Sequence, residues 1–551
     1  MKKNTKILRN VIIAIIILLV GGIYYYIELP ALNIHSPGLW KFVLFLIFFG
    51  TVLTFGIKIK KDYQSFGKSA LKFNKDLILK SNCKWGIFLF GAVLIIFIVG
   101  SVLSSPIINA KRYQGLMTVE ERNFNEDIEE VDYSMIPLLD KASAEILGDR
   151  KLGSMVDMVS QFEVDTEYTQ INYQGRPVRV TPLCYASLIK WFTNQSEGIP
   201  AYMLIDMTTQ DIEVVMLENG IKYSKSEHFN RNLYRHLRFH YPTYIFDDQI
   251  FFEIDEEGTP FWVCPVKKYN IGLFGGQTVG KVVLCNAITG ECVSYDIEDV
   301  PQWVDKVYSA ELLMQLYDYH GTLINGFFNS ILGQKGCIQT TNGYNYIAME
   351  DDVWVYTGVT SVNGDQSNVG FVLMNQRTME TRFYTVEGVI EDSAMSSAEG
   401  QVQNLGYQAT FPLLVNINSE PTYILALKDD AGLVKKYAMV NVKKYQIVAV
   451  GDTIRECEKK YLELLMTNGI LVENVQTQSA HISGTIDSVA AVVIDNNTHY
   501  YLCLEGDDKI FDIDMTNEEL IGIIRYRTGD QITIYYDDSG ESLLKKVSSI
   551  E

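Results

Sequence analysis

The sequence predicts an α+β protein with three N-terminal transmembrane helices, then repeated units of a helix and an antiparallel sheet, and finally a small β-barrel. Three observations predict this architecture. Uncharged apolar runs fill the chain before residue 106, a strand-pair pattern recurs four times in the middle, and a strand-rich tail follows residue 478. Each part is taken below in chain order.

The apolar runs occupy residues 11–27, 42–57 and 85–105. A helix needs about 20 apolar residues to cross a bilayer. The first and third runs meet this length or come close, and the second is short but very apolar. A cleaved signal peptide would explain only the first run, and no small-residue cleavage site follows it. We therefore expect three membrane spans within residues 1–106.

Lysine placement predicts the orientation of these spans. The N-terminus carries Lys2, Lys3, Lys6 and Arg9, and the loop 58–84 is lysine-rich, whereas the loop 28–36 has no Lys or Arg. Positive loops stay in the cytoplasm. The N-terminus is thus expected to be cytoplasmic in a multi-pass protein of the cell membrane, with residues 107–551 extracytoplasmic. Contact of the lysine loop with anionic lipid is an alternative role for its charge.

Charge and cysteine content exclude several classes of protein. The formal net charge is −20 although the first 104 residues are basic, so the remainder is strongly acidic. Such a surface repels nucleic acid; it suits basic partners or cations, and solubility alone would also account for it. The eight cysteines include no C-x-x-C pair. A disulfide scaffold, a structural zinc site and thioredoxin-type chemistry therefore lack support.

Residues 107–164 are expected to form a helical stalk that packs on the next domain. The segment "TVEE" at 118–121 has the spacing of a capping box, with Thr118 as the N-cap and Glu121 at N3. The periodic apolar pattern of "MIPLLDKASAEIL" follows.

Residues 165–470 contain the repeat. Four segments align without gaps, at 202–217, 282–297, 371–386 and 437–452. Each has an apolar strand, an Asx residue, a short polar turn and a second strand. The Asx residues are Asp206, Asn286, Asn375 and Asn441, and three of them are followed three residues later by Thr209, Thr289 or Thr378, with Lys444 in the fourth. These side chains bond back to nearby main chain and so favour hairpin turns.

Similar elements precede three of these segments. Helical patterns at 226–240, 310–332 and 393–404 are each followed by a hairpin and then by the strand pair. A sheet of this kind has one apolar face, so we expect the units to cover one another or their own helices.

The segment "VVLCNAITGECVSYD" resembles the PepSY domain, whose final strands often carry a Val-Asp-x-x-Thr-Gly-Glu turn. Thr289, Gly290 and Glu291 match this turn, with Asn286 in the acidic position, and the other units match only in the order of their elements. The resemblance implies an exported bacterial protein that binds or restrains other proteins, peptidases among them, and it supplies no catalytic residues.

The tail 478–551 has about five strands with one short helix before the fourth, which resembles a small OB-like barrel. That fold can bind oligomers, but this copy lacks a basic groove. A structural cap or a protein docking site is the interpretation we favour for it.

A phosphate-binding loop is suggested by Gly275, Gly280 and Lys281 in "GLFGGQTVGKV". A working loop needs Ser or Thr after the lysine to hold magnesium, and it opens a helix. Here Val282 follows, and the loop opens the strand "KVVLC". We therefore predict no nucleotide and no other cofactor.

The segment 226–240 offers two candidate sites. His236 and His240 have the i, i+4 spacing of zinc ligands, but they share an apolar face with Phe229, Leu233 and Leu237. Packed histidines explain this pattern better, so no metal is predicted. The opposite face carries a candidate contact for an anion or an acidic partner, with local ion pairing as the alternative: Arg231, Arg235 and Arg238.

Cys285 and Cys292 lie symmetrically about the turn at 288–289. If the two arms pair in that register, the side chains face each other across the hairpin. In an oxidising exterior they form a candidate disulfide, although the ideal Cβ separation is slightly shorter than the usual cross-strand one.

The sequence contains no catalytic set that we would defend. The leading interpretation is a non-enzymatic, membrane-anchored extracytoplasmic module that binds or regulates other envelope proteins or peptides. One alternative is a cell-envelope hydrolase with a carboxylate-based site, which requires a deep polar cleft. Another is a structural subunit of a secretion or envelope-assembly complex, which requires apolar patches around the spans. The oligomeric state stays open.

Overall fold

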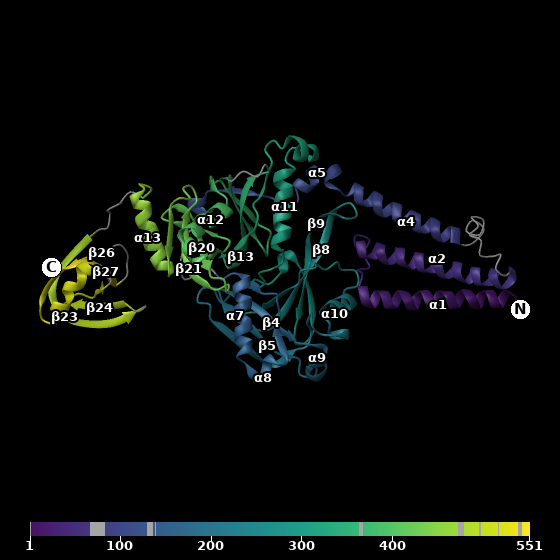
Figure 1. Ribbon diagram of the computed structural model, residues 1–551, viewed down its shortest axis with the longest axis horizontal. Helices are drawn as coiled ribbons and strands as arrows, with labels where there is room; N and C mark the ends of the chain where they lie inside the picture. The colour runs from purple at the N-terminus through teal and green to yellow at the C-terminus, as the bar shows by residue number, and fades with distance from the viewer. Residues whose placement is uncertain are drawn as a thin grey trace. The chain divides into compact units, whose positions relative to one another are not determined.

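The computed structural model describes residues 2–66, 83–128, 136–137, 139–362, 367–471, 479–494, 497–515, 517–537 and 543–550. The chain divides into two compact units, Met1–Tyr461 and Leu462–Glu551. Figure 1 shows the course of the chain, with the long N-terminal helices in purple and the C-terminal strands in yellow.

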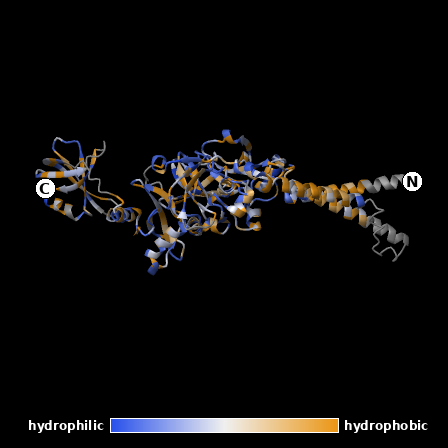
Figure 2. Cartoon of the chain, turned by 90° about the horizontal axis from the view of Figure 1, so that it is seen from above, coloured by the Kyte–Doolittle hydropathy of each residue, from blue (hydrophilic) through white to orange (hydrophobic). Residues whose placement is uncertain are grey.

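Three N-terminal helices are long and apolar enough to cross a membrane: α1 (Lys2–Glu28), α2 (Pro37–Phe66) and α4 (Cys83–Leu103). They pack through aromatic contacts such as Tyr24 on Phe45, with ring centroids 4.6 Å apart. Figure 2 shows the apolar colour along most of the described length of these helices. The expectation of three candidate spans is confirmed, and the direction in which they cross stays a prediction. Most of the lysine-rich loop, residues 67–82, lies outside the described residues.

The expected helical stalk is not a continuous helix. After α5 (Pro106–Gln114), the segment Glu120–Arg122 forms strand β1, which pairs in parallel with β16 (Thr381–Tyr384). Thr118 therefore caps no helix, because main-chain pairing with a distant strand overrides the local capping pattern. The short helices that follow are capped instead by Asn123 and Asp140: α6 (Phe124–Asp127), α7 (Lys141–Gly153) and, after these, α8 (Val156–Val159).

Four antiparallel sheets follow, and each builds on a hairpin joined to a strand pair. The first holds β2 (Phe162–Val164), β3 (Thr169–Tyr173), β4 (Arg176–Tyr185), β5 (Ile199–Asp206) and β6 (Ile212–Ile221). The second holds β7 (Phe251–Ile254), β8 (Pro260–Ile271), β9 (Gly275–Asn286) and β10 (Cys292–Asp296). The third holds β11 (Ile338–Thr340), β12 (Asn345–Met349), β13 (Asp352–Ser361), β15 (Gly370–Asn375) and β16, with β1 added in parallel at the edge beside β16. The fourth holds β18 (Gln408–Ala409), β19 (Leu413–Ile417), β20 (Glu420–Lys428), β21 (Val434–Asn441) and β22 (Val448–Gly451).

All four predicted strand pairs form, and their turns share one hydrogen-bond pattern. Oδ1 of the Asx residue accepts from the main-chain N–H groups two and three residues later, as at Asn286 with Ile288 and Thr289, both at 2.9 Å. In three turns the threonine hydroxyl then accepts from the N–H two residues further on. The first sheet also carries a hairpin, β3–β4, that sequence reasoning missed.

The helices before the sheets are shorter than predicted. The helix expected at 226–240 is α10 (Leu233–His240), because Asn232 caps it at Arg235 N and a 3₁₀ turn, Phe229–Arg231, comes before. The other two predicted helices are α11 (Ala310–Thr322) and α12 (Glu391–Gln401). Two further helices are α9 (Leu188–Asn194), which lies between β4 and β5, and α13 (Ile454–Thr467), which follows the fourth sheet. The short strands β14 (Ser367–Asn368) and β17 (Gly388–Val389) form a separate pair.

The sheets cover one another, as expected. One buried apolar cluster joins the first and second sheets, through residues such as Met203 and Trp262. A second joins the second and third, through Leu284 and Val355, and a third joins the third and fourth, through Trp354 and Leu425. Each sheet thus completes the core of its neighbour, and polar residues buried at these junctions are held in fixed positions.

The C-terminal unit contains a closed five-stranded barrel in the order β23-β24-β25-β27-β26. Its members are β23 (Ser479–Ile494), β24 (Asn497–Leu504), β25 (Ile510–Asp514), β26 (Gln531–Asp537) and β27 (Leu544–Ile550), with a 3₁₀ helix, Glu518–Arg525, before the fourth strand. The small β-barrel is confirmed; its OB-like identity stays a prediction.

Candidate functional site

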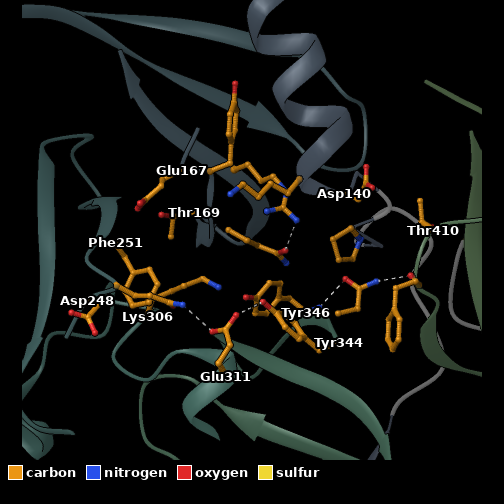
Figure 3. Close-up of a pocket in the computed structure, with 18 residues that line it drawn as sticks. Asp140, Glu167, Thr169, Asp248, Phe251, Lys306, Glu311, Tyr344, Tyr346 and Thr410 are labelled. Atoms are coloured by element: carbon orange, nitrogen blue, oxygen red, sulfur yellow. Dashed lines mark hydrogen bonds between the residues drawn. The ribbon is translucent and has the colours of Figure 1, made fainter. Parts of the chain in front are cut away.

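A cavity of about 440 Å³, lined by both polar and apolar groups, lies among segments that adjoin the four sheets. Its wall combines β3 and β4 of the first sheet, the segment before β7, helix α11 with strand β12, and the segment before β19. Figure 3 shows side chains from these elements pointing toward one space, with Glu167 and Thr169 on one side and Glu311, Tyr344 and Tyr346 opposite.

Arg179 forms part of the cavity wall and is 6 % exposed. It comes from the middle of β4, between Val178 and Val180, which are both fully buried. Its Nε donates to Leu139 O at 3.2 Å and its Nη2 to Gln170 Oε1 at 3.5 Å. Burial lowers the pKa of Arg179. A guanidinium has five N–H donors, so these two bonds leave most of its capacity unused.

Lys306 is the second buried cation of the wall, at 3 % exposed. Its Nζ donates to Gln376 Oε1 at 2.8 Å and lies 3.6 Å from the centroid of the Tyr346 ring. Burial lowers the pKa of Lys306 to about 7, and the positive charge of Arg179 acts in the same direction. Its ammonium group is therefore poised near neutral pH.

The main chain that carries Lys306 is fixed by a buried carboxylate. Glu253 Oε2 accepts from Asp305 N at 2.9 Å, and its Oε1 accepts from Lys306 N at 3.0 Å. Asp305 Oδ2 accepts in turn from Asn172 N at 2.6 Å. Burial raises the pKa of Glu253 to about 7 and also raises the pKa of Asp305. These bonds tie the first and second sheets to the segment that carries Lys306.

The carboxylates of the wall already have partners. Asp140 accepts from Lys428 Nζ at 2.6 Å, Glu167 from Lys225, and Asp248 from Lys267 at 3.1 Å. Glu311 accepts from Tyr344 Oη at 2.9 Å and from Gln249 Nε2 at 3.2 Å. By contrast, no carboxylate of the described residues makes an ion pair with Arg179 or Lys306.

One further polar atom at the cavity is buried without a partner among the described residues: Gln170 Nε2. A buried donor without an acceptor costs about 1–3 kcal/mol. This amide group can donate a hydrogen bond, as can the two cations. The cavity therefore presents an excess of donors to whatever occupies it.

Sequence reasoning missed Arg179 and Lys306. Arg179 lies between two valines in "PVRVTPL", and Lys306 lies between Asp305 and Val307 in the otherwise apolar "WVDKVY". Such an interruption of a buried strand or segment is the signal that could have found them.

Not all side chains of the segment 226–240 are buried or exposed as predicted. Leu233 and Leu237 are fully buried as predicted, but Phe229 is 65 % exposed and Arg238 is only 8 % exposed. Arg238 Nε donates to Leu29 O at 2.8 Å, just beyond the end of α1, and its Nη1 donates to Tyr244 O at 2.5 Å. The predicted outward orientation of Arg238 is therefore wrong, because the end of α1 packs over this face of α10.

Arg235 and Arg231 also bind main-chain carbonyls. Arg235 Nη1 donates to Phe229 O at 2.7 Å, and its guanidinium lies 4.2 Å from the centroid of the Tyr26 ring in α1. Arg231 Nη1 donates to Gln195 O at 2.5 Å. Among the described residues none of the three pairs with a carboxylate, so the local ion-pairing alternative fails as well. A contact with an outside partner stays a prediction.

The predicted cysteine register is confirmed. Cys285 and Cys292 pair directly across β9 and β10, and both are free thiols in the structure. His236 joins them, and ligand atoms of the three residues lie within 4.8 Å of one another. Hydrogen bonding from Cys285 lowers the pKa of Cys292, despite burial, and His236 acts in the same direction. The disulfide itself stays a prediction.

The glycine-rich motif forms part of a β-hairpin. Gly275, Gly280 and Lys281 all lie in β9 rather than in a loop before a helix, as expected, and Lys281 pairs with Asp296 at 2.5 Å. The tip of the β8–β9 hairpin contacts the end of the third candidate span: Ser104 Oγ, directly after α4, accepts from Leu273 N at 2.8 Å.

Comparisons with known proteins give no family. No protein-family model matches the chain, and no curated protein sequence matches it significantly. Among solved structures, a GH32 beta-fructofuranosidase of Bombyx mori is similar at 9% identity, with 73% of this chain and 69% of that chain covered and a TM-score of 0.18. A B. megaterium levansucrase gives 9% identity, 77% and 93% coverage and a TM-score of 0.18. Likeness at this level carries no argument about fold or function.

Proposed function

We propose that this chain is a non-enzymatic, membrane-anchored binding module of the cell envelope, and that its central cavity takes a carboxylate group of a peptide or protein partner. The observation that carries the proposal is the pair Arg179 and Lys306. Both are buried cations in the wall of an open cavity, and neither has a carboxylate partner among the described residues.

The chemistry of the wall favours a carboxylate. Burying a cation without a counter-ion costs free energy, which an anionic ligand offsets. A guanidinium is planar and matches the two oxygens of a carboxylate. The spare donor at Gln170 Nε2 supplies a further hydrogen bond. A volume of about 440 Å³ lies within the range of small-ligand pockets and admits a short chain end.

The setting of the cavity supports a role outside the cytoplasm. The lysine asymmetry of the first 84 residues favours export of the region beyond α4, and the three candidate spans anchor it. The PepSY-like turn at 286–291 and the OB-like order of the C-terminal barrel also favour a binding protein, by resemblance.

A peptide-retention experiment tests the proposal. The detergent-solubilised full chain is immobilised and incubated with a library of N-acetylated tripeptides that have free carboxyl ends, and in parallel with the same library amidated. We expect enrichment of acids over amides by mass spectrometry, and Arg179→Met should weaken retention about tenfold or more. Arg176→Met, three residues away on the same strand and ion-paired with Asp206, is the control that should retain binding. Equal retention of acids and amides, or full binding by the Arg179 variant, would refute the carboxylate site.

The hydrolase alternative stays a prediction. The four carboxylates of the cavity wall are engaged by lysines, a tyrosine and a glutamine. An engaged carboxylate is a poor general base unless substrate displaces its partner.

A second candidate function, a subunit of a larger envelope complex, is favoured by an apolar surface beside α1. Leu188, Ile189 and Phe192 of α9 are exposed, and they line a groove with Phe229 and with Tyr26 of α1. Exposed patches of this kind mark interaction sites. If a partner subunit covers it, Ile189→Asn with Phe192→Asn should reduce the native particle size in mild detergent. An unchanged size, equal to one chain, would remove this candidate.

A further inference from the structure

A cluster of two thiols and an imidazole lies at the edge of the second sheet, away from the residues that line the cavity. Cys285 is the next-to-last residue of β9, Cys292 begins β10, and the two residues are directly opposite in register. His236 reaches them from α10, a helix at the side of this sheet (Figure 1). One ligand atom from each of the three residues lies within 4.8 Å of the other two.

From this juxtaposition we propose that His236, Cys285 and Cys292 form a binding site for a thiophilic metal ion, Zn²⁺ or Cu⁺. Thiolate and imidazole are the ligands that both ions prefer. Tetrahedral zinc with ordinary bond lengths separates its ligand atoms by about 3.5–3.8 Å. Closing the cluster on an ion therefore takes shifts of about an ångström, which rotation of the cysteine side chains supplies.

The backbone around the cluster is rigid. The turn between the cysteines is closed by Asn286 Oδ1, which accepts from Ile288 N and Thr289 N, and by Thr289 Oγ1, which accepts from Glu291 N. Gly290 has φ 77°, a conformation that favours glycine. Helix α10 is fixed from below by Leu233 and Leu237, which are fully buried. The three ligands are thus presented by elements held in place before any ion arrives.

The histidine has the surroundings of a metal ligand. His236 Nε2 lies 2.7 Å from Gly290 O, and since a carbonyl only accepts, Nε2 carries the proton. Metal-binding histidines commonly donate the other ring N–H to a carbonyl, which fixes the tautomer. An ion held through Nδ1 keeps this bond. The Tyr223 ring packs on the imidazole with centroids 4.5 Å apart and shields one side of it.

His240 lies outside this set of three but is a further candidate ligand. It lies one helical turn beyond His236, with the two ring centroids 4.3 Å apart. His240 Nδ1 is bound to His236 O at 2.9 Å, so its Nε2 is the nitrogen left to face an ion. His240 is exposed and Cys292 is half-buried, so an ion can enter from this side. Until His240 or a water molecule binds, a site of three protein ligands keeps one position open.

The test uses the full chain in detergent, purified under reducing conditions and freed of metal with a chelator. Co²⁺ is the spectroscopic probe, because thiolate ligands give it an intense charge-transfer absorption. Titration should show one equivalent with that absorption, displaced by Zn²⁺, and a separate Cu⁺ titration against a competing chelator decides which ion binds more tightly. Cys285→Ser, Cys292→Ser and His236→Phe should each weaken binding about tenfold or more. His240→Ala should have a smaller effect.

Cys184→Ser is the matched control, since Cys184 is a half-buried thiol of β4 outside the cluster. Its cobalt spectrum should be unchanged, and thermal unfolding should show that all variants fold. Absence of the thiolate absorption in the folded reduced protein would overturn the proposal, as would its survival in the Cys285→Ser/Cys292→Ser double variant. Recovery of a Cys285–Cys292 disulfide that blocks Co²⁺ uptake, with uptake restored on reduction, would support the site and show that oxidation closes it.

Discussion

Arg238 and Arg179 are two arginines with nearly the same exposure, 8 % and 6 %, and yet their surroundings differ. Arg238 donates to Leu29 O and Tyr244 O, with longer contacts to Tyr241 O and Pro242 O at 3.4 and 3.5 Å. Arg179 has two bonds and lines the cavity. Arg238 also lines a pocket, beside the end of α1, but it contacts four main-chain carbonyls. Burial lowers the pKa of both. Depth beside an open volume therefore does not by itself mark a functional arginine; the two differ in how many acceptors the protein supplies to the guanidinium.

The carbonyls that hold Arg238 explain its place. Leu29 follows the last residue of α1, where carbonyls lack helical partners and the helix dipole favours a cation. Arg238 therefore joins the first candidate span to the second sheet's helix. The two hydrogen bonds of Arg179 do not link a candidate span to a sheet. We therefore assign Arg179 to the binding of a ligand.

The largest expected effect on stability comes from a substitution in α10 at Leu237, the residue before Arg238. Leu237→Ala should lower the free energy of unfolding by about 2–5 kcal/mol, because Leu237 is fully buried and its loss leaves a cavity. Thermal unfolding of the full chain in detergent measures it. Retention of acidic tripeptides at low temperature should stay normal. Tolerance of this change would show that α10 is not anchored as described.

Arg238→Met should lower the free energy of unfolding by about 2–3 kcal/mol, since buried carbonyls lose a charged donor. The expected protease sensitivity is at the segment 28–36, where α1 loses its contact with Arg238. Arg231→Met, which removes only the bond to Gln195 O, is the milder comparison. If Arg238→Met instead left stability intact and abolished binding of an acidic partner, the original interpretation of this face as a docking surface would regain its case.

Arg179→Met should change the free energy of unfolding by no more than about 1 kcal/mol. Replacing a buried, unpaired charge by an apolar side chain of similar length is often neutral or stabilising. Peptide binding should nevertheless be lost. Calorimetric unfolding with and without peptide separates the two quantities. If Arg179→Met destabilised the protein as much as Arg238→Met, Arg179 would be a structural residue and the two arginines would not differ in role.

The sequence predicted features that depend on neighbouring residues. The apolar runs, the paired strands and the Asx turns are local, and the register of Cys285 with Cys292 followed from the turn between them. The sites depend on distant segments. Arg179 meets Lys306 because the first and third sheets adjoin, and His236 meets the cysteines because α10 folds back beside β9. Helical periodicity placed Leu233 correctly, but it gave no indication that α1 would cover Arg238.

The smallest expected effect concerns pH. Burial lowers the pKa of Lys306 to about 7 from its ordinary 10.5, so its ammonium group loses its proton as pH rises through neutrality. A carboxylate binds the protonated form more tightly, so affinity should fall between pH 6 and pH 8, by up to about tenfold because one pKa unit corresponds to about 1.4 kcal/mol. Arg179 stays charged across this range and keeps the remaining affinity. Lys306→Met should give weaker binding with a flatter pH profile, whereas Lys141→Met, an exposed lysine of the same wall, should leave the slope unchanged. Calorimetric titrations at several pH values measure this dependence. Affinity that rises toward pH 8 would mean that Lys306 acts as a neutral hydrogen-bond donor and that Arg179 alone recognises the carboxylate.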